Sequence, residues 1–114
     1  SKKSPDEKVT ITGEKIETYL NKNKVVVEEH AQVKHPQLEA TAGFLNYDFV
    51  EKKIYLEKEP FIYQKNEDAE GKYWADNIEV DVEKEIIFLK GNVKATFYSE
   101  EYLDFEKELK YKWI

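Results

Sequence analysis

Residues 74–95 read WADNIEVDVEKEIIFLKGNVKA. Apolar residues alternate with polar ones on both sides of a short gap: Ile78, Val80, Val82, Ile87 and Leu89. A period of two is that of a β-strand with one buried face. Val, Ile and Phe are also residue types that favour strands. The stretch therefore predicts two short strands joined by a turn.

Two further windows align with this stretch without gaps: TGEKIETYLNKNKVVVEEHAQV at 12–33 and TAGFLNYDFVEKKIYLEKEPFI at 41–62. Successive windows start 29 and 33 residues apart, which is a spacing typical of structural repeats. The shared positions form five columns: Ile16, Leu45 and Ile78; Thr18, Tyr47 and Val80; Leu20, Phe49 and Val82; Val25, Ile54 and Ile87; Val27, Leu56 and Leu89. Two weaker columns follow: Ala31, Pro60 and Val93; Val33, Ile62 and Ala95. The chain thus predicts three copies of one strand–turn–strand unit.

A gap of four positions, with at least one Lys, separates the two halves of each unit: Asn21–Lys24, Val50–Lys53 and Glu83–Ile86. The apolar positions change parity across the gap. A four-residue hairpin loop predicts this change and places the apolar side chains on one face. The expected register pairs Leu20 with Val25 and Thr18 with Val27, and likewise in the other two units.

Four other segments carry weaker expectations. Gly13 and Gly43 lie at a second change of parity, so we expect a kink near the start of each unit. The polar stretch Gln64–Lys72 is typical of a longer loop. Residues 1–8 form a charged flexible segment ahead of a single domain at 9–114. The tail at 102–114 alternates like a shortened strand unit, although its apolar residues also fit an amphipathic helix.

The windows resemble the OstA-like domain of lipopolysaccharide-transport proteins, the LptA/LptC type. The family pattern is an Ala, then an apolar residue, a polar residue and Tyr-Asp, followed by a Lys-rich turn, alternating apolar residues and Gly-Asn-Val. The matching residues are Ala42 with Leu45–Asp48, Ala75 with Ile78–Asp81, Ile86–Val93 and Ile11–Glu17. The departures are Tyr19 in place of Asp, and Glu29–Ala31 and Lys58–Pro60 in place of Gly-Asn-Val. The resemblance covers roughly residues 9–97.

This resemblance implies an all-β fold in which antiparallel hairpins stack into an open, folded-over sheet, a β-taco or jelly-roll-like structure. In the family, acyl chains of lipopolysaccharide pass through an apolar interior groove, and members join edge to edge into a periplasmic bridge without catalysis. We therefore expect a periplasmic, non-enzymatic domain, and a membrane anchor outside this sequence is compatible with that location. The expected partners are lipopolysaccharide or a related envelope glycolipid, other OstA-like domains and further copies of the chain. The expected groove residues are Ile16, Leu20, Val25, Val27, Leu45, Tyr47, Phe49, Ile54, Leu56, Ile78, Val80, Val82, Ile87 and Leu89.

Each of these features also has a simpler structural explanation. The same apolar columns would fill a closed core. Val26, Tyr55 and Phe88 point to the opposite face, and strands covered on both sides explain them better than a surface that faces lipid or a partner. The aromatic pairs Tyr73-Trp74 and Phe97-Tyr98 favour packing at the repeat ends over a platform for sugars or bases.

Composition excludes several function classes. The 18 basic residues are all Lys and face 24 Asp and Glu, giving a net charge of −6, so we expect no nucleic-acid partner. Cys is absent, and His30 and His35 have poor metal-ligand spacing, so we expect neither a metal site nor a cofactor. Carboxylates are abundant, but their polar surroundings favour solvated charge over a catalytic pair. No nucleophile or phosphate-binding motif is present, so we expect no catalytic residue.

Two other functions fit the same sequence. A structural adapter that assembles by strand addition, without lipid cargo, would need the same hairpins and the same open edges. A carbohydrate-binding or hydrolytic β-repeat protein is a weaker alternative.

Overall fold

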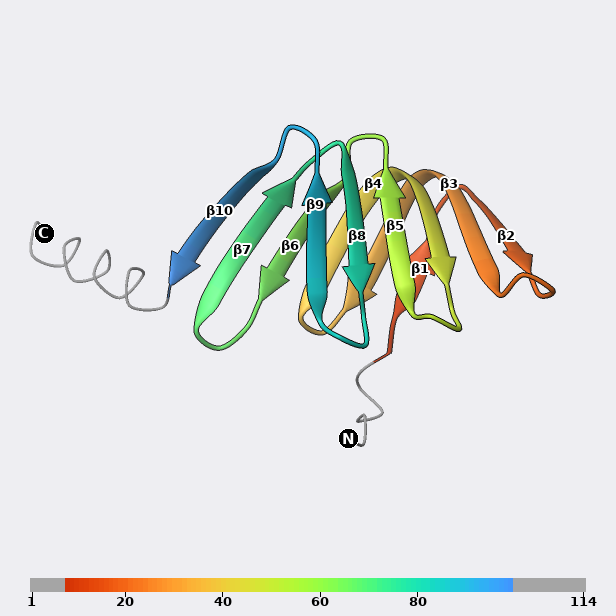
Figure 1. Ribbon diagram of the computed structural model, residues 1–114, viewed down its shortest axis with the longest axis horizontal. Helices are drawn as coiled ribbons and strands as arrows, with labels where there is room; N and C mark the ends of the chain where they lie inside the picture. Colours follow the sequence, from red (N-terminus) through yellow and green to blue (C-terminus); the bar gives the residue numbers. More distant parts are fainter. Residues whose placement is uncertain (1–7, 100–114) are drawn as a thin grey trace, which may run out of the picture.

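The computed structural model describes residues 8–99 and is all-β, as the alternating pattern predicts. Ten strands form one antiparallel sheet (Figure 1). Residues 8–99 contain no helix with the length and apolar character that a bilayer crossing requires. The strands are β1 Thr10–Thr12, β2 Lys15–Tyr19, β3 Lys24–His35, β4 Leu38–Asp48, β5 Lys53–Glu57, β6 Phe61–Lys65, β7 Ala69–Trp74, β8 Asn77–Asp81, β9 Ile86–Lys90 and β10 Lys94–Ser99.

The sheet is built from bent rungs, and each rung is either one long strand or two shorter strands joined end to end. β3 and β4 each form a whole rung, and the other strands join end to end as β1–β2, β5–β6, β7–β8 and β9–β10. Every rung bends at the same level, along a line that we call the spine, and the open side opposite is the mouth. The bends divide the sheet into arm 1, in the order β2-β3-β4-β5-β8-β9, and arm 2, in the order β1-β3-β4-β6-β7-β10. The predicted open, folded-over sheet is therefore confirmed.

Backbone conformation confirms the three-unit repeat. The fourth loop residue of each hairpin, which is Asn23, Lys52 or Glu85, has a left-handed φ of 58°, 59° or 58°. A pair of left-handed residues recurs at each bend: Glu29 and His30, Lys58 and Glu59, Gly91 and Asn92. Both features fall at the same place in all three aligned windows. Since an L-residue rarely adopts this conformation, the coincidence reflects one repeated geometry.

The predicted hairpin register is wrong by two residues. Thr18 pairs with Val25, and the loops comprise residues 20–23, 49–52 and 82–85. Each loop begins one residue earlier than expected because the residue before it caps the turn in the second and third units. The Asp48 Oδ1 accepts the N–H groups of Val50 and Glu51 at 3.0 and 2.9 Å. A shift of two preserves parity, so the apolar strand residues remain on one face.

The bends lie where the sequence predicts kinks, but Gly13 and Gly43 are not the left-handed residues there. Gly13 separates β1 from β2, and Gly43 faces a bulge in β3. The third unit bends at the same level with Ala75 and Asp76 instead. A main-chain hydrogen bond crosses each bend, as from the Gly43 N–H to the Lys58 carbonyl at 2.7 Å. The bend is therefore made by the left-handed pair on the neighbouring rung.

Two other expectations meet the structure differently. The predicted loop at Gln64–Lys72 is wrong, because β6 continues to Lys65 and β7 begins at Ala69. Only residues 66–68 form a turn. The Asn66 Oδ1 accepts the N–H groups of Asp68 and Ala69 there. The expectations for residues 1–7 and for the tail at 102–114 lie outside the described residues.

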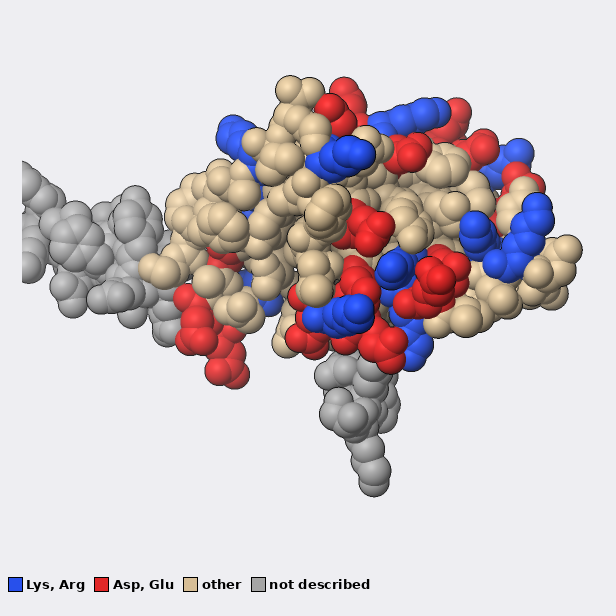
Figure 2. Space-filling view, in the orientation of Figure 1, with Lys and Arg blue, Asp and Glu red and all other residues tan. Residues whose placement is uncertain are grey.

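The outer face of arm 1 is not covered by a second layer. Val26, Tyr55 and Phe88 lie on one outward row, and within residues 8–99 all strands belong to a single sheet. Phe88 on edge strand β9 is 60% exposed. The expectation that both faces of these strands are covered is therefore wrong. Lys, Asp and Glu side chains are interspersed over the visible outer surface (Figure 2).

Candidate functional site

Three ladders on the inner face of the folded sheet each contain one residue from every rung. Two ladders lie on arm 1: Ile16, Val27, Leu45, Leu56, Ile78 and Leu89; Thr18, Val25, Tyr47, Ile54, Val80 and Ile87. One lies on arm 2: Ile11, Val33, Ala40, Ile62, Tyr73 and Ala95. Neighbouring rungs are about 4.8 Å apart, so each ladder is a near-continuous stripe of side chains. None of the ladder residues carries a charge.

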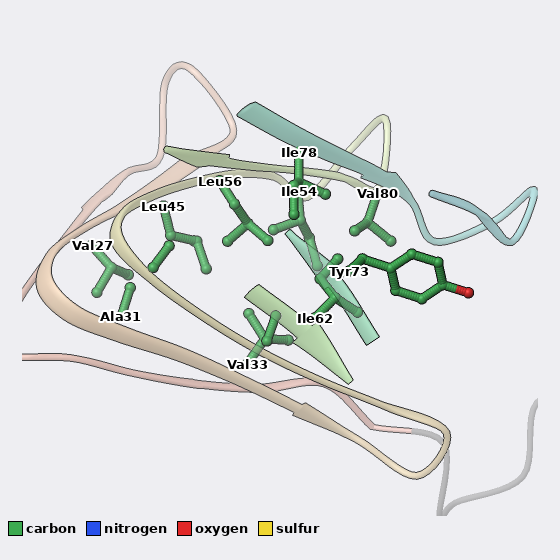
Figure 3. Packing of buried hydrophobic residues seen from close by; sticks show 12 residues of the cluster. Val27, Ala31, Val33, Leu45, Ile54, Leu56, Ile62, Tyr73, Ile78 and Val80 are labelled. Carbon is green, nitrogen blue, oxygen red and sulfur yellow. The ribbon is translucent and has the colours of Figure 1, made fainter. Parts of the chain in front are cut away.

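The middle of the inner face is a packed core. Leu45 and Leu56 of arm 1 point toward Val33 and Ile62 of arm 2 (Figure 3). Leu45 and Ile62 are 0% exposed, which leaves no space between the arms at this level. The sequence left open whether these columns fill a core or line a groove. In the middle rungs they fill a core.

The inner face opens at both ends of the molecule. Ile16, on the first rung, is 46% exposed. On the last rung Ile87 and Leu89 are half-buried, while Phe97 is 65% exposed. The Phe97 and Tyr73 rings meet edge to face, with 5.5 Å between their centroids. The same ladders that form the core therefore present apolar surface at each end.

The structure brings eleven of the fourteen predicted groove residues together on the two ladders of arm 1. The other three, Leu20, Phe49 and Val82, are the first residues of the hairpin loops at the mouth. Leu20 is 78% exposed, and its expected interior position is wrong because the turn begins at this residue. Phe49 and Val82 are half-buried.

Sequence reasoning missed the contribution of arm 2 to the inner face. Val33, Ile62 and Ala95 form one of the weaker columns, and they join Tyr73 on the ladder of arm 2. The alternation of Val33, Ile62 and Ala95 with polar neighbours is the sequence signal that indicates an inward face on arm 2. The two-residue corner at each bend interrupts the alternation, so the columns beyond it do not follow from those before it.

Gln64, Tyr73 and Tyr47 supply polar groups on the inner face toward the mouth. The Tyr73 hydroxyl donates to the Gln64 Oε1 at 2.8 Å, and burial raises the pKa of Tyr73. Burial also raises the pKa of Tyr47, and the neighbouring Asp48 charge adds to this effect. Both phenols therefore stay uncharged at neutral pH. The inner face is suited to an apolar ligand.

The two histidines lie at different places on β3. His30 lies at the spine with its Nδ1 3.2 Å from Glu14 Oε1, and His35 Nδ1 accepts the Gln37 N–H at 3.3 Å. In the part of the chain that the structure describes, no three His, Asp or Glu side chains are placed to hold a metal.

The aromatic pair Tyr73-Trp74 is split between the two faces of β7. Tyr73 faces inward, whereas Trp74 packs outside against Phe61 at 5.1 Å, with Lys94 Nζ 5.0 Å from its ring centroid. The pair therefore forms no common stacking platform.

Comparison with known proteins shows the fold. Neither a family model nor a curated protein matches the sequence. A solved structure that matches is LptH, the LptA-homologous periplasmic component of the conserved lipopolysaccharide transport device from Pseudomonas aeruginosa. The match has 8% sequence identity and a TM-score of 0.53, and it covers 80% of this chain and 95% of that chain. The chain has an LptA-like β-taco fold. At 8% identity, the similarity shows the fold alone.

Proposed function

We propose that this domain is a non-enzymatic periplasmic carrier that binds the acyl chains of lipopolysaccharide or a related envelope glycolipid. The observation that carries the proposal is that three uncharged ladders run through every rung and reach the surface at both ends. Likeness to LptH, itself part of a lipopolysaccharide transport device, supports the same function.

The ladders suit a moving lipid better than a fixed one. Burial of each methylene in apolar surroundings contributes about 0.8 kcal/mol, so an acyl chain gains by entering the open end. Identical rungs about 4.8 Å apart offer similar contacts at successive positions. Since no strong polar anchor lies among the ladder residues, a chain is not held at one rung. An acyl chain passing the middle rungs would have to part the arms.

The lipid claim is tested with photo-crosslinkers at Leu89 and Phe88. These adjacent residues lie on opposite faces of β9, Leu89 on an inner ladder and Phe88 60% exposed outside. After incubation with lipopolysaccharide, crosslinks should form at position 89 and be weak or absent at 88. Equal labelling at both positions would count against an inner lipid site.

The domain also joins other copies, or other domains of the same fold, through its end strands. Within residues 8–99, β9 and β2 each have one paired edge and one free edge. Inside the chain β5 pairs with β8 so that Leu56 faces Ile78. The same register between molecules places Leu89 of one copy opposite Ile16 of the next. Arm 1 ladders then continue across the junction, and apolar surface exposed at both ends becomes buried.

Engineered disulfides test this junction, because the chain has no native Cys. A mixture of Leu89→Cys and Ile16→Cys chains should form a crosslinked dimer under mild oxidation. A Phe88→Cys and Ile16→Cys mixture is the matched control, since these side chains would lie on opposite faces. Equal yields from the two mixtures would rule out the predicted register.

A structural adapter without cargo is the second candidate, and the packed middle of the inner face favours it. Leu45 and Ile62 already fill the space between the arms. An adapter would form the Leu89–Ile16 junction and show no lipid crosslink at Leu89. The two experiments together therefore separate the candidates.

A further inference from the structure

The three hairpin loops of arm 1 form a continuous rim along the mouth. The Phe49 N–H donates to the Asn23 carbonyl at 3.0 Å, and the Val82 N–H donates to the Lys52 carbonyl at 3.0 Å. Each loop therefore begins against the end of the loop before it. The fourth residue of each loop has the same left-handed φ, and the loop tips project from the same edge of the sheet (Figure 1).

The first two loops expose large apolar side chains at this rim. Leu20 is 78% exposed and Val50 is 62% exposed. Tyr19, at the end of β2, is 38% exposed and lies beneath the Lys22 ammonium, whose Nζ is 5.8 Å from the ring centroid. The ladders that form the core do not include these residues. Their exposure therefore has no explanation in the packing of residues 8–99.

Lysines surround these apolar tips and make the rim asymmetric. The first loop and its flank carry Lys22 and Lys24 without an acidic residue, whereas the second carries Lys52 and Lys53 together with the exposed Glu51. Asp48 beside the second loop lies on the outer face between Lys24 and Lys53, and its Oδ1 accepts the Val50 and Glu51 N–H groups. In the third loop Lys84 lies between two glutamates. Excess positive charge thus lies on the first loop, at the β2–β3 end of a protein of net charge −6, where blue side chains are seen together with red ones (Figure 2).

We propose that these first two loops dock on the surface of an anionic lipid bilayer. The docking surface, which we call the basic rim, comprises Leu20, Lys22, Lys24, Val50, Lys52 and Lys53. Leu20 and Val50 enter the headgroup layer, and the lysines pair with lipid phosphates while their stems cover apolar surface. An aromatic residue beside them is typical of groups that rest at a membrane interface.

A bilayer is a better occupant of the basic rim than a protein partner. The rim is a projecting row of loop tips (Figure 1). Its combination of positive charge and apolar tips matches a phosphate layer over hydrocarbon, whereas an acidic protein surface would leave Leu20 and Val50 without apolar contacts. This inference does not rest on the proposed function, because the basic rim lies outside the ladders.

Vesicle binding tests the proposal. The full chain is mixed with vesicles of phosphatidylcholine containing 30% phosphatidylglycerol, or with phosphatidylcholine alone, at 50 and 500 mM NaCl. Lys22→Ala/Lys24→Ala removes charge from the basic rim, and Lys84→Ala/Lys90→Ala removes the same charge at the other end of arm 1. All these lysines are exposed, so both variants should fold, which circular dichroism can verify.

We expect binding to the anionic vesicles at low salt, with strong weakening at 500 mM NaCl. Removal of each rim lysine should weaken binding about fivefold, and the pair about 25-fold. The Lys84/Lys90 control should remain within about twofold of the native chain. A fluorophore on Leu20→Cys should report an apolar environment with vesicles, and one on Ile86→Cys should not. Absence of binding, equal binding to neutral vesicles, or equal loss of binding in both double variants would overturn the proposal. Absence of vesicle binding would instead favour an acidic protein as the partner of the basic rim.

Discussion

At each bend, a residue on one rung faces a residue of the left-handed pair on the neighbouring rung. In two of the three units, one of these two residues is glycine. A Cβ at Gly43 would lie 2.7 Å from the Lys58 Cβ, and a Cβ at Gly91 would lie 2.5 Å from the Asp76 Oδ2. In the second unit the glycine, Gly43, faces the left-handed pair. In the third unit the glycine, Gly91, is itself a member of that pair. Only one side chain of the pair fits at these bends.

This exchange predicts coupled effects of substitution. Gly43→Ala should lower the free energy of unfolding by about 1–3 kcal/mol, because the new Cβ overlaps Lys58. Lys58→Gly should raise it by roughly 0.5–1 kcal/mol, since Lys58 has a φ of 61° that glycine adopts readily. In the double variant Gly43→Ala should cost less than it does alone. Urea denaturation of all four proteins measures the coupling, and strictly additive effects would contradict the predicted contact.

Tyr73 predicts a loss of stability at alkaline pH. Burial raises its pKa above the ordinary value of 10.0, so the folded chain holds this proton more tightly than the unfolded chain. The resulting stability is fully present below pH 10 and declines as pH rises through 10 toward the folded pKa. The free energy of unfolding should therefore fall between pH 9 and 11, and Tyr73→Phe should make that fall smaller. An identical pH profile for the variant would show that Tyr73 is not responsible.

At the scale of strands and turns, the sequence predicts the strands well and their ends poorly. Alternation sets which residues face inward, and that pattern survives a register shift of two. The turns are harder because Leu20, Phe49 and Val82 look like strand residues yet begin the loops. The left-handed φ of Lys52 has no signal in its side chain, since glycine and asparagine are the usual residues there.

The strand at 69–74 was missed for a related reason. Its inward positions hold Gly71 and Tyr73, and its outward ones hold Glu70 and Lys72. Because glycine supplies no apolar side chain, the period of two is not visible there. The flanking Asn66 turn is short, and the rungs on either side supply the hydrogen bonds that define the strand.

The caps of the second and third loops predict unequal losses. Asp48 Oδ1 accepts two main-chain N–H groups, whereas Asp81 Oδ1 accepts that of Lys84 at 2.9 Å. Asp48→Ala should therefore lower the unfolding free energy by about 1–2 kcal/mol, and Asp81→Ala by about half as much. Thermal denaturation of the two variants gives the comparison. A larger loss for Asp81→Ala would mean that these hydrogen bonds do not control loop stability.

At the scale of the whole molecule, rung position decides whether an inner residue is core or surface. The aligned columns predict which residues share a face, and eleven of the predicted groove residues do so. They do not predict burial, because Leu45 and Leu89 have similar sequence surroundings. Leu45 has rungs on both sides and is 0% exposed, whereas Leu89 lies on edge strand β9.

This difference predicts a gradient of stability along the ladder. Leu45→Ala should lower the unfolding free energy by about 2–5 kcal/mol, because it leaves a cavity between the arms. Leu89→Ala should lower it by about 1 kcal/mol or less, since the side chain is half-buried at an open end. Chemical denaturation measures both values at a protein concentration low enough to disfavour association. Equal losses would mean that the end of the inner face is closed.

Methyl NMR during titration with a short-chain lipopolysaccharide is the measurement that bears most directly on the inner face. The methyl signals of Ile16, Ile87 and Leu89 should shift and show contacts to acyl-chain protons. Ile86, which is 52% exposed and lies on the outer face of β9, should not respond in this way. Acyl contacts at Ile86 with none at Leu89 would contradict a lipid site on the inner face.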